Sequence, residues 1–163
     1  VDIEKTVHIA APPDTVFDVW SSVDNFPRFM SLVEEVQRLD DTRSHWVVKG
    51  PAGARLEWDS VITERDRPRL LAWRSEPDAP VQHAGTVHFD AEDGGTKATV
   101  HMCYLPPGGV LGHSVAALFG RDPKREMDED LMRMKSFIET GVEPHDAAHA
   151  RARPDGPAAP PQA

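Results

Sequence analysis

Few side chains in this sequence are suited to acid–base chemistry, and the two that we single out are His83 and Tyr104. An imidazole titrates near neutral pH, and a phenol both donates and accepts hydrogen bonds. The residue alternation places both on the inner side of predicted strands. We therefore predict them as catalytic candidates that act on one ligand as acid and base. The alternative for each is a structural ring whose polar atoms are satisfied within the fold.

A larger set of side chains is suited to binding a flat apolar molecule. Aromatic and methionine side chains supply large apolar surfaces, and serine hydroxyls can orient a ligand between them. Core packing is the alternative for each aromatic residue, and a satisfied buried hydroxyl is the alternative for each serine. The predicted ligand-binding residues are Phe26, Met30, Trp46, Trp58, Ser60, Trp73, Ser75, Met102, Met134 and Ile138.

Metal and cofactor sites are not indicated. His8, His88 and His101 fall on outer faces of strands that could be neighbours, but their spacing matches no zinc signature. Cys103 has no flanking base to activate a thiolate. No nucleotide-binding or hydrolase motif occurs in the sequence. We predict that the protein uses no metal and no cofactor.

Composition narrows the class of protein. The 163 residues suit one domain, with 39% hydrophobic and 28% charged residues. A net charge of −9 disfavours binding to nucleic acid, because like charges repel. The single cysteine excludes an internal disulfide and suits a reducing compartment. With no apolar run near the roughly 18 residues of a membrane span and no signal-peptide pattern, we predict a cytoplasmic location. The sequence carries no signal for an oligomeric state.

The elements that must position these side chains follow from the hydrophobic periodicity. Residues 2–10 alternate as a half-buried strand, with Lys5 the one charge on the apolar side. Pro12 and Pro13 then begin a helix that ends near Ser21, and a second short helix begins around Pro27. Six further strands separated by turn residues are predicted at 34–39, 44–49, 55–64, 70–75, 85–90 and 96–104.

The last two of these strands predict their own register. If Asp90 pairs with Lys97 across the turn at 92–95, the pairs on one face are all apolar. Those pairs are Gly85 with Met102, Val87 with Val100, and Phe89 with Ala98. The opposite face then carries Thr86, His88, Thr99, His101 and Cys103.

A long amphipathic helix is predicted from Asp122 to Gly141. Asp122 suits the N-cap, Pro123 the first helical position and Gly141 the position after the end. The apolar stripe consists of Met127, Leu131, Met134, Phe137 and Ile138, and the other sides carry Glu126, Asp128, Glu129, Arg133 and Lys135. A shorter helical segment is predicted at 110–119, and a disordered Ala/Pro-rich tail at 142–163.

Together these elements predict an α+β domain over residues 1–141, in which one curved antiparallel sheet of about seven strands wraps around the C-terminal helix. The inner face of such a sheet is wider than one helix can cover. We therefore expect a cavity between sheet and helix, where small apolar ligands bind in folds of this shape.

The sequence resembles the START-like (SRPBCC) superfamily. The likeness lies in the opening VDIEKTVHIAAPPDTVFDVWSSVDNFPRFMSLVEEV with its Phe26-Pro27 dipeptide, the hairpin HFDAEDGGTKATV, the exit YLPPGG and the long final helix. It runs from about Ile3 to Thr140 and is strongest to the bacterial polyketide cyclase/dehydrase group. The resemblance implies a helix-grip fold that binds hydrophobic molecules.

The resemblance also bears on activity. Aromatase/cyclases of this kind are similar in length and are thought to fold a poly-β-ketone with a few polar side chains, notably arginines on inner strand positions. Those positions fall on or near Ile62 and Ser75 in this sequence. Three functions remain open: binding of a small hydrophobic, polyketide- or lipid-like molecule, a polyketide cyclase or dehydratase using His83 and Tyr104, and a quinone- or protein-binding module.

Overall fold

The computed structural model describes residues 2–50, 53–80, 82–105 and 123–141. Its elements in chain order are β1 (Asp2–Ile9), α1 (Pro13–Ser21), the 3₁₀ helix η1 (Val23–Arg28), β2 (Val33–Arg38), β3 (Arg43–Lys49), β4 (Arg55–Asp66), β5 (Leu70–Ser75), β6 (Gln82–Glu92), β7 (Gly95–Leu105) and α3 (Pro123–Thr140). The predicted helical segment at 110–119, the N-cap at Asp122 and the predicted disordered tail at 142–163 lie outside the described residues.

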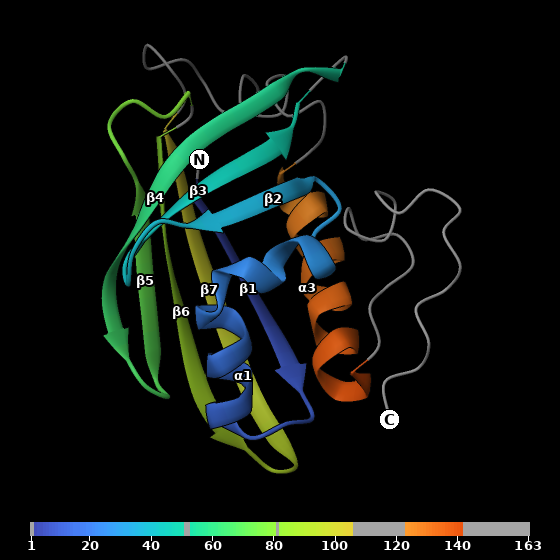
Figure 1. The fold of residues 1–163 in the computed structure, drawn as a ribbon. Helices are drawn as coiled ribbons and strands as arrows, with labels where there is room; N and C mark the ends of the chain where they lie inside the picture. The colour runs from blue at the N-terminus through green and yellow to red at the C-terminus, as the bar shows by residue number, and fades with distance from the viewer. Residues whose placement is uncertain (1, 51–52, 81, 106–122, 142–163) are drawn as a thin grey trace, which may run out of the picture.

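One antiparallel sheet holds all seven strands in the order β1-β7-β6-β5-β4-β3-β2. The sheet is strongly curved, and α1, η1 and α3 lie on its concave side (Figure 1). The predicted α+β helix-grip architecture, with two short helices after the first strand and a long helix at the end, is therefore confirmed.

The predicted register of the last hairpin is also confirmed. Asp90 pairs with Lys97, and the apolar pairs follow as expected on one face. Gly94, in the turn between the strands, has a φ of 78°, a conformation that favours glycine. The strands extend beyond the predicted limits, and the added pairs include His83 opposite Tyr104. The two catalytic candidates are thus neighbours across β6 and β7.

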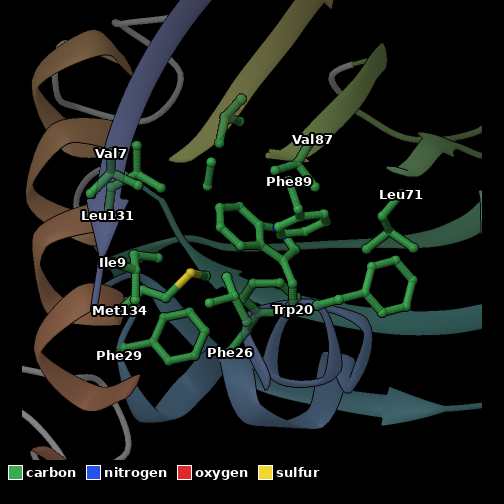
Figure 2. Close-up of a cluster of buried hydrophobic side chains, with 14 of the residues drawn as sticks. Val7, Ile9, Trp20, Phe26, Phe29, Leu71, Val87, Phe89, Leu131 and Met134 are labelled. Carbon is green, nitrogen blue, oxygen red and sulfur yellow. The ribbon is translucent and has the colours of Figure 1, made fainter. Parts of the chain in front are cut away.

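The C-terminal helix begins and ends where its sequence signals place it. Pro123 is its first residue, and Gly141 follows its last with a φ of 71° while donating its N–H to the Phe137 carbonyl at 2.8 Å. Figure 2 shows Leu131 and Met134 of α3 in the same buried cluster as Ile9 of β1. The predicted apolar stripe therefore faces the sheet.

Polar contacts tie α3 to the first strand. Lys5, the charge on the apolar side of β1, extends its Nζ to 3.0 Å from a carboxylate oxygen of Asp128. Near the other end of the helix, Lys135 Nζ donates to the His8 carbonyl at 2.6 Å, and Glu139 accepts the Ala10 N–H at 2.7 Å. The helix is thus anchored along β1. Within the ranges described above, no helix is long and apolar enough to cross a membrane.

Two methionines of α3 allow a matched test of this packing. Met134 is 3% exposed and Met132 is 59% exposed. We expect Met134→Ala to lower the free energy of unfolding by about 2–4 kcal/mol, because it removes buried contacts and leaves a void, and Met132→Ala to change it by less than about 0.5 kcal/mol. Urea denaturation of both variants checks this. Equal effects would contradict the orientation of the helix.

Candidate functional site

A cavity of about 220 Å³ lies between the concave face of the sheet and α3. A cavity needs a volume of only roughly 10–15 Å³ to hold one water, so this space can hold a small organic molecule. Among the described helices and strands, all except β1 contribute side chains to the cavity wall. The lining residues are Trp20, Val23, Phe26, Phe29, Met30, Leu32, Val33, Ser44, Trp46, Val48, Trp58, Ser60, Ile62, Leu71, Trp73, His83, Val100, Met102, Tyr104, Glu126, Met127, Asp130, Leu131 and Met134.

All four tryptophans of the chain line this cavity. Trp46 and Trp58 are direct partners across β3 and β4, so their side chains share the inner face. The Trp46 ring packs against Phe26 with ring centroids 5.2 Å apart, and its Nε1 donates to Ser44 Oγ at 2.9 Å. The indole N–H is therefore satisfied, and the ring surface remains available to an apolar occupant.

Gly85 makes room for two of the wall residues. It lies on β6 between Trp73 of β5 and Met102 of β7, each its direct partner across the sheet. A Cβ at this position would come within 2.5 Å of the Trp73 ring and 2.4 Å of Met102 Sδ, closer than any real contact. The absence of a side chain at Gly85 therefore lets both neighbours lie over it, and this sets the shape of the wall.

The two catalytic candidates meet in this wall. The rings of His83 and Tyr104 have centroids 6.2 Å apart, and His83 also packs edge-on against Trp58 at 5.1 Å. Burial, together with the nearby Asp130 carboxylate, raises the pKa of Tyr104 to about 12. The phenol therefore keeps its proton near neutral pH and can serve as a hydrogen-bond donor, but not as a base.

An acidic end of the cavity, formed by Glu126 and Asp130 of α3, was missed by the sequence analysis. Ser31, which precedes β2, donates its hydroxyl to Glu126 Oε1 at 2.6 Å and its N–H to Asp130 Oδ1 at 3.4 Å. Arg133 donates to the same Oδ1 at 2.7 Å. These contacts hold both carboxyl groups in place where the helix meets the segment between η1 and β2.

The charge state of Asp130 is strongly perturbed. Burial is the main cause, followed by the nearby Glu126 carboxylate, and together they outweigh Arg133 and raise the pKa of Asp130 to about 7. Only 8% of Asp130 is exposed. Its charge therefore changes within the physiological pH range, unlike that of an ordinary aspartate.

The sequence analysis placed Glu126 and Arg133 on sides of the helix other than the apolar stripe, and it did not foresee that Glu126 lines the cavity. The side chain of Arg133 is only 10% exposed. Glu126 and Asp130 are four residues apart, each directly before a residue of the apolar stripe, Met127 and Leu131. Carboxyl groups that border an apolar stripe at this spacing are the signal that could have revealed the acidic end.

The cavity brings together most of the predicted binding residues, whose contact with a ligand remains a prediction. Ser75 and Ile138 lie elsewhere. Ser75 is buried, but its Oγ accepts the His83 N–H at 3.0 Å, and Ile138 packs against the core further along α3. The predicted residues that line the cavity are Phe26, Met30, Trp46, Trp58, Ser60, Trp73, Met102 and Met134, together with His83 and Tyr104.

The outer-face histidines are not gathered into one site. His8 Nδ1 lies 2.7 Å from a Glu92 carboxylate oxygen, and His101 lies 3.9 Å from Asp2. In the part of the chain that the structure describes, no group of three or more histidine, cysteine or acidic residues could hold a metal ion. A hydrogen bond with Asp2, together with burial, raises the pKa of Cys103, which disfavours its thiolate.

Of the two positions at which the resemblance places cyclase arginines, only one borders the cavity. Ile62 lines the cavity, and Ser75 does not. Among the described residues that form the wall, none is an arginine or a lysine. The arginines that the resemblance implied for folding a poly-β-ketone therefore have no cationic counterpart among the described residues of this wall.

Comparison with known proteins identifies related chains. Residues 9–132 match the family model described as polyketide cyclase/dehydrase and lipid transport. An uncharacterised 17.2 kDa protein of Streptomyces lincolnensis is 32% identical over 138 residues, which cover 84% of this chain and 89% of the relative.

Solved structures share the fold. A crystal structure of a Deinococcus radiodurans protein superposes with a TM-score of 0.69 at 30% identity, covering 87% of this chain and 99% of that one. The di-domain ARO/CYC StfQ from the steffimycin biosynthetic pathway superposes with a TM-score of 0.62 at 16% identity, covering 85% of this chain and 45% of StfQ. The second likeness concerns the fold alone.

The buried carboxyl of Asp130 should make stability depend on pH. Its pKa is raised from 3.8 to about 7, so the folded state binds its proton more tightly than the unfolded state, and the stability gained from the protonated form is lost as pH rises. Between about pH 5 and about pH 7.5 the Asp130 contribution should fall by on the order of 2–3 kcal/mol.

Asp130→Asn should remove that part of the pH dependence, as measured by urea unfolding across this range. Asp128→Asn is the matched control, because Asp128 is exposed on the same helix, and it should keep the dependence of the parent protein. A slope in Asp130→Asn equal to that of the parent would contradict a raised pKa.

Proposed function

Because this chain belongs to the polyketide cyclase/dehydrase and lipid transport family, we propose that it binds a small hydrophobic or aromatic molecule, polyketide- or lipid-like, in the cavity between the sheet and α3. The observation that supports this most directly is the wall itself, which gathers all four tryptophans around an internal space. Family membership supports the general role, and the cavity supports the proposed location of the ligand.

The free energy for binding would come mainly from apolar burial. A two-ring molecule that buries on the order of 200 Å² of apolar surface gains about 5 kcal/mol gross at about 25 cal/mol per Å². Loss of translational and rotational freedom offsets part of this gain, so the fixed shape of the wall matters for affinity. In the described part of the chain, every buried side-chain nitrogen and oxygen has a hydrogen-bond partner. These enclosed groups therefore need no hydrogen bond from an occupant.

A second candidate function, a polyketide cyclase or dehydratase, is favoured by one specific observation. His83 and Tyr104 are direct partners across β6 and β7, and both line the cavity. In this mechanism the imidazole would take a proton from the ligand, while the phenol would donate a hydrogen bond to the oxygen that gains charge. Conversion of a ligand, lost in a His83→Phe variant that still binds it, would support this function.

A quinone- or protein-binding module has less support. Among the described residues the large hydrophobic side chains that are exposed are Leu39, in the turn after β2, and Met132 of α3. They do not form the contiguous apolar patch typical of a protein interface.

Native mass spectrometry tests the binding function directly. Protein purified from its own host under non-denaturing conditions should carry a small molecule that is lost on denaturation. Consistently empty protein that also fails to bind the neutral dye N-phenyl-1-naphthylamine would contradict the proposal.

Gly85→Ala tests whether the wall around Trp73 sets affinity. The added methyl would displace the Trp73 ring or Met102, and overpacking of this kind costs about 1–3 kcal/mol. We expect about tenfold weaker binding of N-phenyl-1-naphthylamine, measured by fluorescence titration.

Ala84→Val is the matched control for this variant. Ala84 is exposed on the same strand, one residue away, so extra bulk there points away from the cavity. This variant should bind the dye as the parent does. If Gly85→Ala folds and binds with parental affinity, the dye does not occupy this part of the cavity.

A further inference from the structure

We propose that the preferred occupant is a hydrophobic amine, whose protonated nitrogen lies at the acidic end of the cavity, between Glu126 and Asp130, and whose apolar body lies against the tryptophans. The proposal rests on the binding function above and names the chemical class of the ligand. It predicts that the protein distinguishes ligands of equal shape by charge.

The charge of the wall supports this choice. Two carboxyl groups line the cavity, and no arginine or lysine does so among the described residues. Arg133, which lies behind Asp130, is shared with a second carboxylate, Glu129, at 3.6 Å. Two carboxyl groups, those of Glu129 and Asp130, thus share one guanidinium.

The hydrogen bonds of Asp130 leave one oxygen unused. Both the Ser31 N–H and the Arg133 guanidinium donate to Oδ1. Within the described ranges Oδ2 accepts no hydrogen bond, although 92% of the residue is buried, and no fully enclosed oxygen there lacks a partner. Oδ2 must therefore border open space, and Asp130 is one of the residues that line the cavity.

A protonated amine matches these oxygens chemically. An ammonium carries up to three N–H donors and a positive charge, which Oδ2 of Asp130 and the Glu126 carboxylate can neutralise. The raised pKa of Asp130 has burial and the neighbouring Glu126 as its main causes, and a bound cation would oppose both by stabilising the ionised carboxylate. A ligand carboxylate would instead add a further negative charge in a poorly solvated space.

Three probes of one shape test this selectivity: 2-naphthylmethylamine, which is cationic, 2-naphthylmethanol, which is neutral, and 2-naphthoate, which is anionic. Isothermal titration calorimetry near pH 8, where Asp130 is ionised, should give at least about tenfold tighter binding for the amine than for the alcohol. The carboxylate should bind most weakly. An alcohol that binds as tightly as the amine, or a carboxylate that binds tightest, would overturn the inference and leave the binding function standing.

Variants of the two carboxyl groups locate the effect. Asp130→Asn and Glu126→Gln keep the side-chain shape, and each should reduce the amine-to-alcohol affinity ratio to below about threefold. Asp128→Asn, on the exposed side of α3, should leave the ratio unchanged. A ratio does not depend on the fraction of folded protein, and either variant alone suffices if the other is unstable. Parental ratios in both variants would overturn the inference, and failure of all three probes to bind would overturn the binding function itself.

Discussion

The packing of one narrow apolar stripe against a wide concave sheet is the constraint on which the rest of the structure depends. The stripe of α3 buries Leu131 and Met134 against β1 and the residues after η1, and the polar contacts along β1 hold the helix to that side. The central strands β3 to β6 curve away from it. Their inner side chains are large and aromatic but do not fill the remaining space. A cavity therefore remains, because the concave face of the sheet is wider than the apolar stripe of α3.

The same packing explains why polar groups face the cavity. A helix presents side chains on all sides, and the residues beside its apolar stripe reach the edge of the space that the stripe leaves open. Glu126 and Asp130 occupy that edge. The cost of burying Asp130 is partly offset by Arg133 and the Ser31 N–H, but a buried ion pair adds little net stability compared with apolar packing. A local departure from the most stable arrangement is typical of a functional site, where ligand contact supplies the compensation.

The sequence was sufficient for the architecture because its signals there are periodic and reinforce one another. The register of β6 and β7 follows from one turn and the alternation of Val87, Phe89, Ala98 and Val100, since a slip of one residue would expose every apolar side chain. The limits of α3 follow from Pro123 and Gly141. Alternation also placed Ser75 on an inner face, and it is buried, but its hydroxyl is bonded to the backbone of His83 and lies away from the cavity. Periodicity gives the face of a residue but not its depth along a curved sheet. The acidic end was missed for another reason: Glu126 and Asp130 border the apolar stripe of α3, and the helical period alone does not show which bordering residues reach the cavity.

The two perturbed groups of the cavity bear on whether it binds or reacts. Burial raises the pKa of both Tyr104 and Asp130, yet the consequences differ, because the phenol then stays protonated at every physiological pH while the carboxyl changes charge near pH 7. Tyr104 consequently stays a protonated phenol, and Asp130 is a cavity group whose charge responds to pH. A carrier needs only this much: a shaped apolar wall, a hydrogen-bond donor and a carboxyl group that is either neutral or negative depending on pH. An enzyme needs in addition a group that takes a proton and returns it, and His83, which lies beside Tyr104 in the cavity wall, is the candidate that the sequence predicted for this role.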